Sequence, residues 1–410
     1  MLFSELGFSP ALLQAVTSLG HATPTAIQYA AIPPALDGRD ILATAQTGSG
    51  KTLAFAAPLL QKLTSPERNR RAQALVLVPT RELATQVGET LTALAQQLPL
   101  PVRVSVLFGG VSINPQMMAL RGGTDVIVAT AGRLLDLIDH NALTLEGVHT
   151  LVLDEADRML DLGFSEELAR ILALLPRKRQ SLFFSATFPP AVQSLAQTLL
   201  LDPVRVEVIA EPENRPDICQ RAISVSPERR TQLLRHLITT QGWTRVLVFV
   251  ATKHAAEIVA DKLRKAGIDA EPFHGLLSQG KRTQVLQDFK SSRITAVIAT
   301  DMAARGLDIS QLPVVVNYDL PRSAVDYTHR IGRTGRAGQA GLAISFVCAG
   351  TEAHFQLIER REHLKVAREL IAGFEPSELN QAITAAPPGG GIKGKRPSKK
   401  DKLRAAAAAA

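Results

Sequence analysis

A glycine-rich run near the amino terminus has the residue types that hold a nucleotide phosphate. Ala45-Gln-Thr-Gly-Ser-Gly-Lys-Thr52 follows a short stretch at residues 40–44 that has the pattern of a strand. In a strand, turn and helix of this kind, the loop amides point at an anion, the lysine neutralises the β and γ phosphates, and the threonine hydroxyl binds Mg²⁺. We therefore predict ATP or a related nucleotide with Mg²⁺, bound by Thr47, Gly48, Ser49, Gly50, Lys51 and Thr52.

Three carboxylates could complete a hydrolytic site. The apolar residues 151–153 are followed by Asp154, Glu155 and, after one alanine, Asp157. A helix cap at a solvated strand end would explain one or two acids, but not a strand that ends beside a phosphate loop. Asp154 is placed to hold Mg²⁺ through water, and Glu155 to orient the attacking water and accept its proton. The two motifs together predict hydrolysis of a nucleoside triphosphate.

These motifs need a scaffold, and the apolar pattern predicts parallel sheets. Short apolar runs alternate with helix-compatible segments, which is typical of sheets covered by helices on both faces. The runs lie at residues 74–78, 104–108, 125–129, 151–154, 182–185, 246–250, 296–300 and 314–318. In such sheets, functional residues lie in loops at the carboxyl ends of strands. The phosphate loop and the acidic motif both fall there.

The chain is long enough for two or three domains. The alternation of apolar runs and helix-compatible segments stops once along the chain and then begins again. A proline-rich polar segment at 211–216 interrupts it. We predict an α/β protein with two tandem parallel-sheet lobes at 1–208 and 218–370, joined by a linker at 209–217. Residues 371–410 are predicted to form a basic, low-complexity tail. Its basic end, from Pro387 onward, is predicted to be disordered because it lacks the apolar residues needed to pack.

Charge and composition narrow the class of protein. Of the net charge of +8, the segment 393–404 alone carries +6, so the basic character lies in the tail, which is either a solubilising end or an RNA-attracting one. No apolar run is long enough to cross a membrane, and the start resembles no secretory signal, so we expect a cytoplasmic protein. Cys219 and Cys348 are too far apart in sequence to suggest a disulfide framework or zinc site, and both are expected to be buried.

In the number and order of its motifs, the chain resembles a DEAD-box ATP-dependent RNA helicase over about residues 1–350. Asp154 to Asp157 spell the family name, and residues 20–28 resemble the family's adenine-reading Q motif. The resemblance implies two RecA-like lobes, with Gln28 pairing with adenine, Phe3 as the isolated upstream aromatic, and His21 where Phe or Tyr is usual. Ala131 also departs from the family pattern, which usually has proline there. Ala45 replaces the first glycine of the usual phosphate-loop pattern, a departure that many helicase loops share.

The resemblance also implies roles for residues in other motifs. In lobe one, Ser185 and Thr187, with Asp157, would link hydrolysis to movement of the lobes. In lobe two, Arg333 and Arg336 would be arginine fingers, Asp308 would contact the ribose, and His329 would join the network to lobe one. The positions that match the family's RNA motifs are Thr80, Arg81, Gly109, Gly110, Thr130, Gly132, Arg133, Thr252, Gly275, Gln279, Arg282 and Thr300.

Taken singly, each of these threonines and glycines would more often be a turn or a helix cap. As a set they offer hydroxyls, amides and arginines suited to phosphates and 2′-hydroxyls, which predicts sequence-independent RNA binding. ATP and RNA would both favour closure of the lobes, and one closure would separate only a few base pairs. Three rivals remain open: an RNA clamp that does not unwind, a DNA translocase, and a phosphate-loop kinase, which leaves lobe two unexplained.

Among relatives, the short amino terminus and the basic end most resemble the bacterial RhlE-like branch. This resemblance implies ribosome biogenesis or RNA turnover, with ribosomal or RNA-decay protein partners. We expect a monomer.

Overall fold

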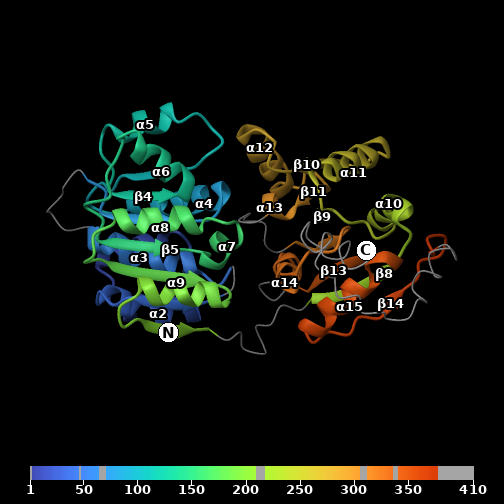
Figure 1. The fold of residues 1–410 in the computed structure, drawn as a ribbon, viewed down its shortest axis with the longest axis horizontal. Helices are drawn as coiled ribbons and strands as arrows, with labels where there is room; N and C mark the ends of the chain where they lie inside the picture. Colours follow the sequence, from blue (N-terminus) through green and yellow to red (C-terminus); the bar gives the residue numbers. More distant parts are fainter. Residues whose placement is uncertain are drawn as a thin grey trace, which may run out of the picture.

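The computed structural model describes residues 2–45, 48–63, 71–208, 218–304, 312–335 and 340–376. These residues form two α/β lobes that lie side by side (Figure 1). Each lobe is built on a seven-stranded sheet in which every strand pairing is parallel. The predicted α/β fold class with two tandem parallel-sheet lobes is therefore confirmed.

Lobe one has the strand order β3-β4-β2-β5-β6-β1-β7. Its strands are β1 (Ile41–Thr44), β2 (Ala74–Leu77), β3 (Val104–Leu107), β4 (Val126–Ala129), β5 (Thr150–Leu153), β6 (Gln180–Ser185) and β7 (Val204–Glu207). Its helices are η1 (Phe3–Leu6), α1 (Pro10–Ser18), α2 (Ala26–Leu36), α3 (Lys51–Leu63), α4 (Arg81–Gln96), α5 (Asn114–Leu120), α6 (Ala131–Asp139), α7 (Ala156–Asp161), α8 (Ser165–Leu174) and α9 (Pro190–Leu199).

Burial on both faces explains why the central strands of lobe one are continuously apolar. In β2 and β4, Val76 and Val128 face one hydrophobic core, whereas Leu75 and Ile127 face a second core on the opposite side. Successive side chains of a strand point to opposite faces, so a strand between two helix layers buries every residue. The sheet is thus held by packing on both faces, and the loops extend from the carboxyl ends of its strands.

Lobe two repeats this design with the strand order β10-β11-β9-β12-β13-β8-β14. Its strands are β8 (Ile218–Ser224), β9 (Val246–Val250), β10 (Ala270–Phe273), β11 (Ala296–Thr300), β12 (Val314–Asn317), β13 (Gly341–Val347) and β14 (Arg368–Glu369). Its helices are η3 (Pro227–Arg229), α10 (Arg230–Thr240), α11 (Lys253–Lys265), α12 (Gln279–Lys290), α13 (Asp301–Ala304), α14 (Ala324–Ile331), η4 (Ala349–Thr351) and α15 (Glu352–Arg361).

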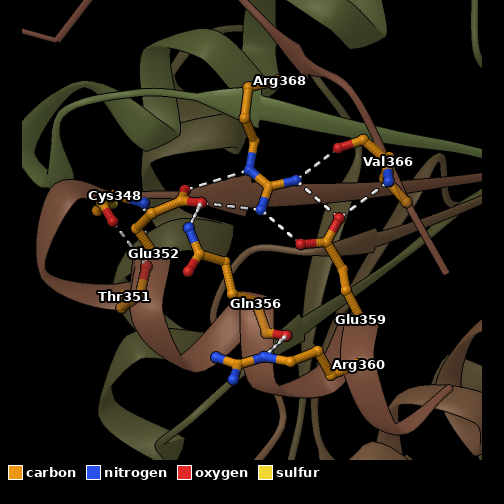
Figure 2. Close-up of polar contacts among 8 residues, drawn as sticks. All are labelled: Cys348, Thr351, Glu352, Gln356, Glu359, Arg360, Val366 and Arg368. Atoms are coloured by element: carbon orange, nitrogen blue, oxygen red, sulfur yellow. Dashed lines mark hydrogen bonds and ion pairs between the residues drawn. The ribbon is translucent and has the colours of Figure 1, made fainter. Parts of the chain in front are cut away.

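Ion pairs hold the short edge strand β14 against lobe two. Figure 2 shows the Arg368 guanidinium between the carboxylates of Glu352 and Glu359 on α15, with contacts of 2.9 and 2.8 Å. Next to it, Glu369 accepts hydrogen bonds from Arg221 of β8. A two-residue strand has too few ladder hydrogen bonds to be stable alone, so these side chains fix its register.

The end of lobe two lies beyond residue 370, where the predicted tail begins. Ile371 and Phe374 pack against the hydrophobic core of the lobe, and Arg229 donates a hydrogen bond to the carbonyl of Gly373. The predicted linker at 209–217 and the basic segment at 393–404 lie outside the described residues. Within the described ranges, no helix has both the length and the apolar character needed to span a bilayer.

One cysteine differs from the sequence-based expectation. Cys348 is buried as predicted, but Cys219 is exposed on β8. Cys219 lies near the start of β8, before Ala222 and Ile223, which are the residues of β8 that pair with the edge strand β14 and are buried. The expectation that both thiols are buried was therefore wrong for Cys219.

Candidate functional site

The sheet of lobe one brings the predicted nucleotide residues to one edge. The phosphate loop follows β1, the acidic motif follows β5, and Ser185 ends β6; in the sheet these three strands are adjacent, in the order β5-β6-β1. The carboxyl ends of neighbouring parallel strands share one edge, so segments more than 100 residues apart in sequence meet there. The predicted juxtaposition of the phosphate loop and the acids follows from this strand order.

The phosphate loop leads into α3, whose first residue is Lys51. Gly48 and Gly50 have positive φ angles of 85° and 93°, which side chains rarely adopt. A Cβ atom on Gly50 would also overlap the side-chain amide of Gln28. The backbone conformation of the loop therefore requires glycine at both positions. This conformation places the amino end of α3 directly after the loop. Thr47 of the predicted set lies outside the described residues.

Lys51 and Asp154 form a buried pair with unused hydrogen-bonding capacity. The Lys51 Nζ lies 3.8 Å from Asp154 Oδ1, and each side chain is at most 6% exposed. Neither atom has a hydrogen-bond partner among the described residues. Burial raises the pKa of Asp154 to about 6, although the nearby Lys51 opposes the shift. Buried polar groups are ordinarily hydrogen-bonded, so this pair fits a site that receives a charged ligand.

The chemistry of these donors fits Mg²⁺. No cluster of three or more potential metal-binding side chains occurs in the described part of the chain. Mg²⁺ commonly needs only one or two carboxylates, because substrate phosphates and waters supply its other ligands. The half-buried Thr52 hydroxyl and the Asp154 carboxylate are suited to that task. When bound, Mg²⁺ would neutralise charge on the phosphates.

The segment at residues 25–28 clamps the phosphate loop. Thr25 Oγ1 donates a hydrogen bond to the carbonyl of Ser49 at 2.8 Å, and Gln28 Nε2 donates one to the carbonyl of Gly50 at 3.0 Å. The Gln28 Oε1 atom accepts a hydrogen bond from the Thr25 amide, and the Gln28 side chain is buried. Sequence reasoning assigned Gln28 to adenine and did not single out Thr25.

The other two residues of the predicted adenine set lie apart from this clamp. Phe3 is 2% exposed and stacks on Phe8 with a centroid distance of 6.2 Å, within the core of lobe one. His21 is exposed, in the turn after α1. Phe3 is therefore buried, whereas His21 is accessible.

The acidic motif and the end of β6 are joined by hydrogen bonds. The Asp157 carboxylate accepts from the amide of Thr187 at 2.9 Å and from its hydroxyl at 2.8 Å. Ser185 Oγ accepts from the Asp157 amide and donates to the Thr187 carbonyl. The structure thus brings together the three residues expected to couple hydrolysis to lobe movement.

Glu155 is held by a neighbour that sequence reasoning did not single out. Its Oε2 atom lies 2.8 Å from Nη1 of Arg158, and both side chains are buried. Glu155 itself has left-handed backbone angles (φ 54°, ψ 49°), which are uncommon for a residue with a side chain. The spacing of three residues at the start of a helix could have suggested this pair.

Residues of lobe two face these acids across the lobe boundary. His329 on α14 lies close enough to Arg158 and Asp157 for their charges to affect it. Burial, followed by Arg158, lowers the pKa of His329 to about 4. Arg333 follows on the same chain segment and is buried. Of the other residues predicted here, Asp308 and Arg336 lie outside the described residues.

The predicted RNA residues gather at the same edge of each sheet. In lobe one they follow β2, β3 and β4, and in lobe two they follow β9 and β10 or end β11; in each sheet the three strands are neighbours. Thr80 and Thr252 also cap α4 and α11, accepting hydrogen bonds from the amides of Leu83 and Ala255. Their hydroxyls therefore have a structural role as well.

The arginines of the RNA set differ in their surroundings. Arg81 lies over Gly110, since a Cβ there would overlap its guanidinium. Arg133 is buried and donates to the Val111 carbonyl at 2.7 Å. Gly109 follows β3, as Gly110 does, and Thr130 and Gly132 lie at the start of α6 beside Arg133. The lobe-two members Gly275, Gln279 and Thr300 lie at or near the carboxyl ends of β10 and β11.

Arg282 makes a contact between the lobes. Its Nη2 and Nε atoms lie 2.6 and 2.8 Å from Glu82 Oε1, and both side chains are buried. Its guanidinium also stacks on Phe273 at 4.6 Å. Glu82 belongs to α4 of lobe one, and Figure 1 shows α12 on the side of lobe two that faces that lobe. Sequence reasoning gave Arg282 to RNA and did not single out Glu82.

Comparisons with known proteins match both lobes. The family model for the DEAD/DEAH box helicase matches residues 25–195, and the model for the helicase conserved C-terminal domain matches residues 229–338. The DEAD-box ATP-dependent RNA helicase CshA of Bacillus cereus is 42% identical over 366 residues, which cover 89% of this chain and 69% of the relative.

Two solved structures are informative together. S. cerevisiae Dbp5 bound to RNA and ADP BeF3 is 31% identical with a TM-score of 0.81, covering 93% of this chain and 98% of that one. A DEAD box protein from Methanococcus jannaschii is 37% identical, yet its TM-score is 0.52 over 90% of this chain and 99% of that one. The chain with the higher sequence identity thus superposes less well than Dbp5 does.

Proposed function

Because the chain belongs to the DEAD-box family of ATP-dependent RNA helicases, we propose that it hydrolyses ATP to ADP and phosphate in an RNA-stimulated cycle. Lobe one binds the nucleotide, while His329 and Arg333 of lobe two complete the site. The observation that carries this proposal is the position of His329, which lies across the lobe boundary from Asp157 and Arg158. Hydrolysis then requires the two lobes to meet.

The residues of the nucleotide site have different roles in hydrolysis. Lys51 neutralises phosphate charge, with Asp154 and Thr52 as the residues that would hold Mg²⁺. Glu155 orients the attacking water and accepts its proton. Arg333, with Arg336, stabilises charge on the transferred phosphoryl group. Gln28 keeps the phosphate loop in shape through the Gly50 carbonyl and is the candidate to pair with adenine.

RNA binding at the strand ends would couple to the same closure. Phosphate and 2′-hydroxyl contacts from the strand-end loops of both lobes require both sheets to face one strand of RNA. ATP and RNA would then raise each other's affinity, because both favour the arrangement in which the lobes meet. S. cerevisiae Dbp5, which this chain resembles, is a precedent for a chain that holds RNA and a nucleotide analogue at the same time.

Unwinding would be local. Coupling free energies of about 1–3 kcal/mol compare with roughly 1.4 kcal/mol per stacked step in a DNA duplex. One closure therefore separates only a few base pairs, and release follows hydrolysis. A cytoplasmic monomer that serves ribosome assembly or RNA turnover, with ribosomal or RNA-decay proteins as partners, completes the proposal. The RhlE-like branch stays a prediction, since the Bacillus cereus relative is named CshA.

The test is steady-state ATP hydrolysis with Mg²⁺ and three additions: no nucleic acid, single-stranded RNA, and single-stranded DNA of the same sequence. We expect strong stimulation by RNA alone. Equal rates in all three conditions would contradict the proposal, and stimulation by DNA would favour a DNA translocase. Strand separation of RNA duplexes of increasing length, with an expected loss of activity beyond about one helical turn, tests local unwinding.

A further inference from the structure

Arg158 is a buried cation at the lobe boundary to which none of the roles above has been given. It directly follows the acidic motif, in the first turn of α7, and its side chain is 4% exposed. Burying an arginine is costly unless its charge is paired and its donors are used. The partners of Arg158 therefore indicate its function.

Its first partner is the general base of the proposed reaction. Nη1 of Arg158 donates to Glu155 Oε2 at 2.8 Å. Glu155 precedes the helix with left-handed backbone angles, so its side chain leaves the chain in a direction that α7 itself does not set. The contact with the guanidinium is the one hydrogen bond of the Glu155 carboxylate within the described residues. Arg158 therefore determines where this carboxylate lies.

Its second set of neighbours belongs to lobe two. Arg158 lines a recess together with Phe249, His329, Arg330 and Arg333 of lobe two. The Arg158 charge also contributes to the lowered pKa of His329. The Nη2 atom of Arg158 is buried and has no hydrogen-bond partner among the described residues.

We propose that Arg158 is a positioning residue that holds Glu155 in place and makes that placement depend on the presence of lobe two. Nη1 of the guanidinium holds the carboxylate, and the Arg158 side chain also lines the recess whose other wall, on lobe two, includes His329. When the lobes separate, Arg158 loses this support and Glu155 loses its orientation. The inference rests on the proposed ATP hydrolysis, in which Glu155 accepts the proton.

Arg158→Met tests the proposal, because methionine keeps much of the packing volume without the charge. We expect RNA-stimulated kcat to fall about tenfold or more, which is part of the loss that removing a general base itself would cause. The Kd for ATP and the KM for RNA should stay within about threefold, since Arg158 contacts neither in the proposed site. Arg158→Lys, which keeps a cation but lacks the planar fork of guanidinium donors, should recover part of the lost rate.

A matched control separates positioning from general stability. Arg368→Met also removes a guanidinium that bridges carboxylates, but in the cluster of Figure 2, which lies on β14 and α15. It should lower the melting temperature and leave kcat unchanged. If Arg158→Met fails to fold, Arg158→Lys still provides the comparison of kcat with ATP affinity.

A double-mutant cycle tests the route through Glu155. In the Glu155→Gln background, measured by single-turnover hydrolysis, Arg158→Met should have almost no further effect. A full additional loss, a kcat of Arg158→Met within twofold of wild type, or a parallel loss of ATP binding would overturn the inference. These outcomes differ from failure of the proposed function, in which the wild-type protein itself shows no RNA-stimulated hydrolysis.

Discussion

The amine of Lys51 and the carboxylate of Asp154 face each other without a shared hydrogen bond. Leaving buried polar atoms unsatisfied lowers the stability of the folded protein by roughly 1–3 kcal/mol per group. A phosphate and its Mg²⁺ would satisfy both atoms, so part of the binding free energy comes from relieving this deficit. The two side chains are thus placed to meet a phosphate and its metal with little rearrangement, which favours catalysis.

At Glu155, the substitution Glu155→Gln removes the proton acceptor while keeping the shape of the side chain. We expect ATP and RNA binding to stay within about threefold and kcat to fall by about 10²-fold or more, the usual contribution of a general base. Equilibrium binding of a fluorescent ATP analogue and steady-state hydrolysis measure the two quantities. Loss of ATP binding in this variant would contradict the assignment of Glu155.

At His329, the lowered pKa of about 4 predicts a dependence on pH. The unfolded chain, with an ordinary histidine pKa of about 6.5, binds the proton more readily than the folded one, so acidification favours unfolding. The contribution of His329 to the free energy of unfolding is fully present above about pH 6.5 and is lost as the pH falls toward about 4. Between about pH 7 and pH 5 the loss should be about 1–2 kcal/mol.

Thermal unfolding of wild type and His329→Gln across this pH range checks the prediction. The variant should lose less stability on acidification, because glutamine does not titrate. Parallel curves for the two proteins would show that His329 does not carry a lowered pKa. Basal stability at about pH 8 serves as the control, where the imidazole is neutral in both the folded and the unfolded state.

At the scale of elements, α4 and α12 are joined by the buried pair of Glu82 and Arg282. Arg282→Glu would place two carboxylates together, and breaking a buried ion pair costs about 3–5 kcal/mol. Since the pair bridges the lobes, the cost falls on their contact and not on the fold of either lobe. We expect the RNA-stimulated rate to fall about tenfold or more, with ATP affinity of lobe one preserved.

Reversing both charges provides the matched control. The combination of Glu82→Arg and Arg282→Glu restores opposite charges and should recover part of the RNA-stimulated rate, measured beside each single variant. A wild-type rate in Arg282→Glu alone would show that the pair does not hold the lobes together. RNA affinity in the same variants separates this role from direct RNA contact by Arg282.

The elements themselves were largely predictable from sequence, for a physical reason. Buried parallel strands are continuously apolar, so β2, β4, β5, β9, β11 and β12 stand out along the chain. The edge strand β7 alternates Val204 and Val206 with Arg205 and Glu207, and such a pattern is short and half polar. It is recognisable only from its place beside β1 in the sheet.

Side-chain pairing was less predictable than the motifs. Lys51, Asp154 and Glu155 follow strands, and strand order alone brings them to one edge. The partner of Arg282 lies 200 residues away in the other lobe, and its identity depends on how the lobes meet. Local sequence does not encode that placement. The left-handed angles of Glu155 depend equally on surrounding structure.

At the scale of the whole molecule, the two lobes meet at one boundary. This boundary contains the contact beside the nucleotide site and the ion pair between α4 and α12. Near the nucleotide edge, α7 faces α14 through Arg158 and His329; elsewhere on the boundary, α4 meets α12 through Glu82 and Arg282. A ligand that brings the lobes together at one place therefore favours the contact at the other. This arrangement gives the predicted coupling between ATP and RNA a structural basis.

The basic segment at 393–404 makes a prediction for the whole chain. Removing residues 393–410 deletes a local charge of +6 and should weaken RNA binding mainly at low salt. The slope of log affinity against log salt should become shallower by about 0.7 for each RNA phosphate that the truncated chain no longer neutralises. Fluorescence anisotropy with labelled single-stranded RNA at several salt concentrations measures this slope. An unchanged slope would identify the segment as a solubilising end.

The exposure of Cys219 has a practical consequence. Burial raises the pKa of the Cys348 thiol, which keeps it in the unreactive protonated form, whereas Cys219 is open to solvent on β8. Because the sequence contains two cysteines, a maleimide dye at neutral pH should attach to lobe two at one position. A second dye on a cysteine introduced in lobe one would turn the chain into a distance sensor, in which single-molecule energy transfer follows opening and closing turnover by turnover.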